Sequence, residues 1–112
     1  MIIDDNPGFR ASARRVLEDE GYRVLAEAGD GESGVELVLE HSPDIAIVDI
    51  QLPGIDGFEV TRRIGVSASA PAVVLTSSRD RSDFGSLVEH SFARGFVPKS
   101  LLTAEAVEAL IS

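Results

Sequence analysis

The chain has 112 residues, enough for one domain with its own core and too few for a second of ordinary size. It contains no cysteine, which excludes disulfides, thiolate zinc sites and cysteine nucleophiles. Its net charge of −9 argues against nucleic acid as a ligand, and no apolar run or leader pattern indicates a membrane span or export. We therefore expect a soluble, cytoplasmic domain that binds neither nucleic acid nor membrane.

Short apolar runs recur along the chain and predict strands. They lie at residues 1–3, 24–26, 45–48, 72–75 and 96–97. The third and fourth are continuously apolar and rich in β-branched residues, which is typical of parallel strands covered on both faces. The first is short for a central strand, so we expect either a weak strand or a chain that lacks native residues before Met1.

Segments with helical periodicity lie between these runs, and most of them open with a capping residue. Asn6 followed by Pro7, Asp30, Asp56 and Thr103 are the predicted starts of four helices. A further helix is expected from Ser82 or Asp83 to Gly95, because Phe84, Leu87, Val88 and Phe92 follow a 3.6-residue period that predicts a buried face.

The alternation of strands and helices predicts an α/β fold. Five units of this kind are too few for an eight-fold barrel, so the expected architecture is a single-domain, doubly wound, five-stranded parallel sheet. Right-handed crossovers would place helices on both of its faces. No linker or repeat divides the chain, and the domain is expected to span residues 1–112.

Polar side chains follow the ends of several predicted strands, where ligands of open parallel sheets bind. They are Asp4 and Asp5, Asp49, Thr76 and Ser77, and Lys99. Each taken alone fits an ordinary capping, turn or surface role. Three carboxylates in one pocket would repel one another, and a bound divalent cation would relieve that repulsion. Carboxylates, a cation and an ammonium together would form a receptacle for a phosphoryl group.

This set of residues resembles the receiver domain of bacterial response regulators, over essentially the whole chain. The matching segments are Asp4-Asp5, the loop Asp49-Ile50-Gln51-Leu52-Pro53-Gly54-Ile55-Asp56-Gly57, then Val74-Leu75-Thr76-Ser77 and Gly95-Phe96-Val97-Pro98-Lys99-Ser100. The resemblance implies a flavodoxin-like fold, as in chemotaxis proteins, with strand order 2-1-3-4-5.

The resemblance also implies a role for each matching residue. Asp49 would accept a phosphoryl group from the phosphohistidine of a sensor histidine kinase. Mg²⁺ (or Mn²⁺) would be bound by Asp5 directly and by Asp4 through water, with Asp49 and the backbone carbonyl of Gln51. The hydroxyl of Thr76, the backbone N–H of Ser77 and the ammonium of Lys99 would hold the phosphoryl oxygens.

A switch is the activity that the resemblance implies, with self-phosphorylation and self-dephosphorylation as ancillary chemistry and no enzyme function. Movement of Thr76 toward the phosphoryl group would leave space for Phe96, and the surface formed by residues 82–95, the strand at 96–97 and the last helix would change. That surface would support a homodimer or control a DNA-binding output domain, which is expected to be absent from these residues.

Some positions depart from the family pattern, and two alternatives stay open. Phe96 lacks the hydroxyl of the tyrosine common there, and Ser100 replaces a proline, so we expect a trans bond after Lys99. Pro98 suits an edge strand. One alternative is a phosphatase or phosphotransferase on the same sheet, although Gln51 stands where a phosphatase would need a second acid. The other is a non-phosphorylated pseudo-receiver that acts as a dimerisation or protein-interaction module.

Overall fold

A parallel sheet forms the centre of the computed structural model, which describes residues 1–67 and 69–112. Its five strands are β1 (Ile2–Ile3), β2 (Glu27–Ala28), β3 (Ile45–Asp49), β4 (Ala72–Ser77) and β5 (Gly95–Pro98), in the order β2-β1-β3-β4-β5. The α-helices of the described residues are α1 (Pro7–Asp19), α2 (Gly31–His41), α3 (Gly57–Gly65) and α4 (Ala104–Ile111). The predicted doubly wound sheet and its strand order are confirmed.

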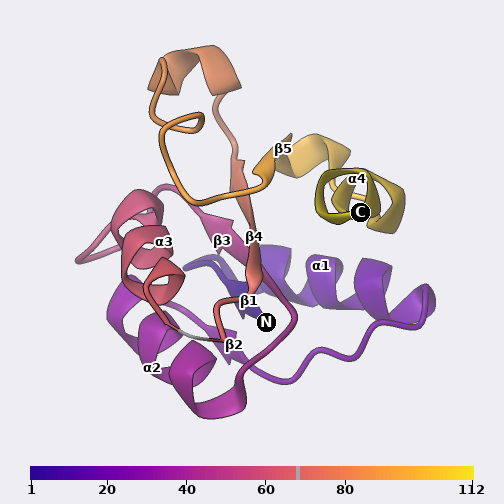
Figure 1. Ribbon diagram of the computed structural model, residues 1–112. Helices are drawn as coiled ribbons and strands as arrows, with labels where there is room; N and C mark the ends of the chain where they lie inside the picture. Colours follow the sequence, from indigo (N-terminus) through magenta and orange to yellow (C-terminus); the bar gives the residue numbers. More distant parts are fainter. Residues whose placement is uncertain (68) are drawn as a thin grey trace.

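The helices cover both faces of the sheet, as Figure 1 shows, with α2 and α3 on one side and α1 and α4 on the other. Consecutive residues of β1 point to opposite faces and belong to different halves of the core. Ile3 lies in the half that includes Ile64 of α3. Ile2 lies in the half that includes Leu17 of α1 and Val107 of α4. Because both faces are buried, the strands read as continuous apolar runs.

The predicted helix starts are confirmed by their capping bonds. The side chains of Asn6, Asp30, Asp56 and Thr103 accept hydrogen bonds from the backbone N–H three residues later, at 3.1, 2.8, 2.9 and 3.0 Å. Each bond satisfies an N–H that the helix leaves without a partner. These caps fix where the chain leaves the sheet, and thereby the geometry of the loops at its carboxyl end.

The first two strands are shorter than the apolar runs that predict them. β1 has two residues, Ile2 and Ile3, and their parallel partners in β2 are Glu27 and Ala28. The expected second strand at residues 24–26 is therefore wrong in position. A strand forms where its backbone can hydrogen-bond to a neighbouring strand. The register with β1 places β2 at residues 27–28, later in the chain than the apolar run at residues 24–26. Ala26 still accepts a hydrogen bond from the Ile2 N–H, at 3.3 Å.

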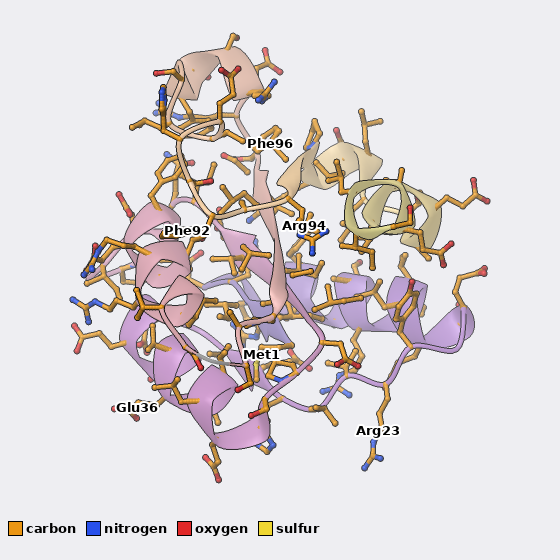
Figure 2. All side chains as sticks on the ribbon, in the orientation of Figure 1. Met1, Arg23, Glu36, Phe92, Arg94 and Phe96 are labelled. Atoms are coloured by element: carbon orange, nitrogen blue, oxygen red, sulfur yellow. The ribbon has the colours of Figure 1, made fainter. Side chains whose placement is uncertain are left out.

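The helix predicted from residue 82 to residue 95 is wrong. The chain forms a 3₁₀ helix, η1 (Arg81–Phe84), and then a series of turns above the sheet (Figure 1). Gly85 has φ of 58°, a left-handed conformation that ends the helical backbone. Leu87 and Phe92 are 56% and 65% exposed, so only part of the periodic face that predicts the helix is buried. Phe92, labelled in Figure 2, lies against Gly65 of α3.

The end of the sheet agrees with the remaining expectations. Pro98 is the last residue of β5, and β5 is an edge strand, as expected. The Lys99–Ser100 peptide is trans, as are all others that the structure describes. A second 3₁₀ helix, η2 (Lys99–Leu101), leads from β5 toward α4. Within the described residues, no helix has the length and apolar character needed to cross a membrane.

Candidate phosphoryl and metal site

The polar residues predicted at the strand ends meet at one edge of the sheet. Asp4 follows β1, Asp49 is the last residue of β3, and Thr76 pairs with Asp49 in the β3–β4 ladder. Lys99 follows β5 directly. Because the strands are parallel, their carboxyl ends converge, and side chains as far apart as residues 4 and 99 become neighbours.

Three carboxylates form the acidic part of the site. Asp4, Asp5 and Asp49 each offer an oxygen, and these oxygens all lie within 4.8 Å of one another. Asp4 and Asp49 are buried, whereas Asp5 is exposed and faces a solvent-accessible depression that also includes Gln51 and Lys99. Carboxylate oxygens in a half-open pocket are the ligands that Mg²⁺ takes together with water. The donor set therefore fits the expected cation.

Lys99 makes direct contact with the two buried carboxylates. Its Nζ lies 2.7 Å from Asp4 Oδ2 and 3.1 Å from Asp49 Oδ2. Lys99 therefore forms an ion pair with each of the two buried acids. The ammonium also lies 4.7 Å from the centre of the Phe9 ring, a cation–π distance. One cation thus balances both buried acids.

The surroundings of Asp49 and Lys99 shift both pKa values. Burial raises the pKa of the Asp49 carboxyl, and the charge of Asp4 adds to the rise, against the lowering effect of the Gln51 N–H and Lys99. Burial acts to lower the pKa of the Lys99 ammonium, but Asp4 and Asp49 outweigh it and the pKa is raised. The lysine stays protonated, and Asp49 is a more basic carboxylate than one in water. Such perturbed pairs are typical of reactive sites.

Thr76 and Ser77 lie in β4 beside Asp49, and both are fully buried. The Thr76 hydroxyl has no hydrogen-bond partner among the residues that the structure describes. An unpaired buried hydroxyl costs free energy, which makes this atom a candidate to bind a ligand. The Ser77 hydroxyl accepts a bond from the Arg79 N–H at 3.0 Å and lies 3.5 Å from Gln51 Oε1.

Gln51 and Phe96 are the two remaining residues of the predicted site. The Gln51 N–H donates to Asp49 Oδ1 at 3.1 Å, which fixes the Asp49 side chain, and Gln51 itself is exposed. Phe96, labelled in Figure 2, is half-buried. Its ring centre lies 6.1 Å from that of Phe84, which in turn contacts Phe58 of α3. The aromatic ring expected near Thr76 is therefore packed against the segment that follows β4.

Arg10 is a residue of this site that the sequence pattern does not predict. Its Nη1 donates to the backbone carbonyl of Asp4 at 2.6 Å, although the residue lies in α1. A usable signal was its place on the first turns of a helix that begins beside the acidic pair. Arg14 of the same helix also contacts β2, because its Nε lies 2.6 Å from Glu27 Oε2. His41 and His90 are exposed.

Similarity to known proteins agrees with this arrangement. The family model described as response regulator receiver domain matches residues 1–111. The transcriptional regulatory protein AfsQ1 of Streptomyces coelicolor is 41% identical over 83 residues, covering 74% of this chain and 36% of AfsQ1. The response regulator UvrY of Escherichia coli is 31% identical over 113 residues, covering 100% of this chain and 52% of UvrY. The chain thus spans about half or less of the length of these curated relatives.

Solved structures lead to the same family. The signal receiver domain of the response regulator NarL from Mycobacterium tuberculosis superimposes with a TM-score of 0.84 at 32% identity, covering 98% of this chain and 90% of that one. A LuxR-family two-component response regulator from Aurantimonas gives 0.86 at 37% identity, covering 98% and 79%. The fold, the converging polar residues and the matching family model agree. The chain belongs to the receiver domains of response regulators, the signalling switches of two-component systems.

Proposed function

We propose that this domain is a phosphoaccepting switch in which Asp49 receives a phosphoryl group from a sensor histidine kinase. The observation that carries the proposal is the cluster of Asp4, Asp5 and Asp49 within 4.8 Å, with Lys99 in contact with the two buried acids. A purely structural ion pair would not need a third carboxylate open to solvent. A phosphoryl acceptor needs a nucleophile, a cation site and a fixed positive charge.

The transfer is a displacement at phosphorus. A carboxylate oxygen of Asp49 forms the new O–P bond while the N–P bond of the kinase phosphohistidine breaks, and the imidazole leaves with the electron pair of that bond. Asp5, Asp49 and the Gln51 carbonyl would hold Mg²⁺ directly and Asp4 would hold it through water, and the cation would supply neutralisation of charge on the carboxylates and the phosphoryl oxygens. Lys99 exchanges a carboxylate contact for one with a phosphoryl oxygen.

The hydroxyl of Thr76 and the backbone N–H of Ser77 complete the phosphoryl contacts in this proposal. Thr76 supports the proposal because its buried hydroxyl can donate a hydrogen bond and has no acceptor within the described residues. A charged phosphoryl oxygen is a strong acceptor. Movement of Thr76 toward it would free space that the half-buried Phe96 ring can enter.

Such a movement would change the surface made of residues 81–92, β5 and α4. This replaces the helix-based surface expected from the sequence, since residues 81–92 are a 3₁₀ helix and turns. In this proposal the changed surface forms a homodimer or regulates a DNA-binding output domain. Two of the relatives support this, the transcriptional regulatory protein AfsQ1 and the response regulator UvrY, and this chain spans about half or less of each.

Exposure of the protein to acetyl phosphate and Mg²⁺, followed by intact mass measurement, tests the proposal. The wild-type chain is expected to gain one phosphoryl group, and the Asp49→Ala variant none. Asp44→Asn is the matched control, because Asp44 is an exposed acid before the opposite end of β3, and it should be modified like the wild type. A wild-type chain that gains no mass would contradict the proposal and favour the pseudo-receiver alternative.

A further inference from the structure

We propose that Arg10 is a positioning residue of the acidic pocket, and that it sets the affinity for Mg²⁺ by holding the turn between Asp4 and Asp5. This inference rests on the proposed function of that pocket. Arg10 lies in α1, contributes no oxygen to the cluster, and acts through the backbone. Its contacts join the turn to β2, on the far side of β1 from Asp49.

The Arg10 guanidinium bridges two groups. Nη1 donates to the Asp4 carbonyl oxygen at 2.6 Å, and Nε donates to Glu27 Oε1 at 3.2 Å. Glu27 Oε2 is held in turn by Arg14 Nε at 2.6 Å. The Arg10 side chain is 22% exposed and that of Glu27 25%, so both are shielded from water along most of their length. A planar guanidinium held at two points has little freedom, and it fixes the carbonyl that it contacts.

The Asp4 carbonyl belongs to the peptide that joins Asp4 to Asp5. Its direction therefore decides where the Asp5 side chain leaves the backbone. The opposite side of the same turn is held by the Asn6 N–H, which donates to Asp4 Oδ1 at 2.8 Å. Asp5 is exposed, and its backbone rather than side-chain packing must place its carboxylate within reach of Asp49. Arg10 supplies that constraint from outside the turn.

Positioning and simple charge predict effects of opposite sign. A guanidinium near a cation site repels the cation, so its removal would tighten Mg²⁺ binding if charge were decisive. The charge of Arg10 is balanced in part by Glu27, which it shares with Arg14, and this weakens the repulsion. Loss of the carbonyl contact would instead loosen the Asp5 backbone and weaken binding. Removal of partners that orient metal ligands typically lowers metal affinity ~10–100-fold.

Mg²⁺ titration of the 112-residue chain, followed by the NMR amide shifts of Asp5 and Ile50, tests the inference. We expect Arg10→Met to weaken Mg²⁺ affinity about tenfold, at the low end of the range for such partners. Arg10→Lys should weaken it similarly, because a single ammonium keeps the charge but cannot bridge Asp4 and Glu27. Arg15→Met is the matched control: it removes one charge from an exposed position of the same helix and should change little.

The outcomes separate the two proposals. Affinity that is unchanged or tighter in Arg10→Met, or wild-type affinity in Arg10→Lys, overturns the positioning role. A wild-type chain without measurable Mg²⁺ binding overturns the proposed function itself. If Arg10→Met does not fold, Arg10→Lys carries the test, because it keeps the positive charge and removes the bridge between Asp4 and Glu27.

Discussion

The ammonium of Lys99 lies 2.7 Å from Asp4 Oδ2, closer than to the proposed phosphoacceptor Asp49. Asp4 is almost fully buried, and its Oδ2 atom has no aligned hydrogen bond among the described residues. In this state the lysine therefore stabilises the acid pair as much as the nucleophile. Phosphorylation of Asp49 would change the contacts of Lys99 with these two acids.

Replacement of Lys99 by methionine should destabilise the metal-free protein. It leaves Asp4 and Asp49 buried without a cation, and breaking a buried ion pair on one side costs several kcal/mol. Because the Lys99 side chain is 18% exposed, we expect the free energy of unfolding to fall by about 2 kcal/mol, a value reduced for solvent screening. Urea denaturation without Mg²⁺ measures it.

Mg²⁺ should then stabilise the Lys99→Met variant more than the wild type, because the cation takes over the balance of charge that the lysine supplied. Arg79→Met, which removes an exposed cation after β4, serves as the control and should change stability little. Equal stability of Lys99→Met and wild type in the absence of Mg²⁺ would show that the ion pair contributes nothing.

Glu59 offers a test of electrostatics away from the site. Arg62 and Arg63 lower the pKa of its carboxyl from 4.5 to about 2 through hydrogen bonds at 2.6–2.8 Å. A lowered pKa stabilises the fold above pH 4.5, and this contribution is lost as pH falls through about 2. An NMR titration of the Glu59 side chain should give a midpoint near 2.

Salt and substitution provide the controls for Glu59. At about 1 M salt, where the Debye length is ~3 Å, the midpoint should move up, because the pair is exposed and screened. The double variant Arg62→Met with Arg63→Met should bring it back toward the ordinary range. A midpoint near 4.5 in the wild type at low salt would mean that these contacts do not persist in solution.

The sequence predicts the site better than it predicts the elements that carry it. Asp4, Asp49, Thr76 and Lys99 could be placed together because parallel strands bring their carboxyl ends to one edge, whatever the exact strand limits are. The Lys99–Asp4 contact could not, since it depends on a side-chain conformation. The bridge from Arg10 to Glu27 was missed for a similar reason, because nothing in their spacing shows that they meet.

Residues 81–92 show why periodicity alone fails. Phe84, Leu87, Val88 and Phe92 have helical spacing, yet a helix this short gains most of its stability from a surface to pack against. In the structure Phe84 and Val88 pack in the core, whereas Leu87 and Phe92 are exposed. Gly85 ends the helical backbone. The sequence shows which residues are apolar but not which of them meet a partner.

Replacement of Gly57 by alanine should damage the loop that carries Asp49. A Cβ atom at this position would collide with the Asp49 carbonyl oxygen and lie 2.7 Å from Ile50 Cα, and backbone atoms cannot yield as a flexible side chain would. Overpacking of this kind costs about 1–3 kcal/mol. We expect a lower free energy of unfolding, measured in urea, and a displaced Asp49 amide signal in NMR spectra.

Gly29→Ala is the matched control for Gly57. Its added Cβ would lie 3.4 Å from Arg10 Nη1, an ordinary contact distance with a flexible side chain, so stability should change by less than about 1 kcal/mol. If both glycines tolerate alanine equally, the loop has more room than the structure shows. Gly57 would then have no special part in placing Asp49.

Replacement of Thr76 by valine should leave the unphosphorylated protein at least as stable as the wild type, because its buried hydroxyl has no partner within the described residues. Thr61 is the matched control: it is equally buried, but its hydroxyl donates to the Gly57 carbonyl at 2.7 Å, so Thr61→Val should lose about 1 kcal/mol. Urea denaturation compares the two. A clear loss of stability in Thr76→Val would show that the hydroxyl already has a partner, and its availability to a phosphoryl oxygen would lose its support.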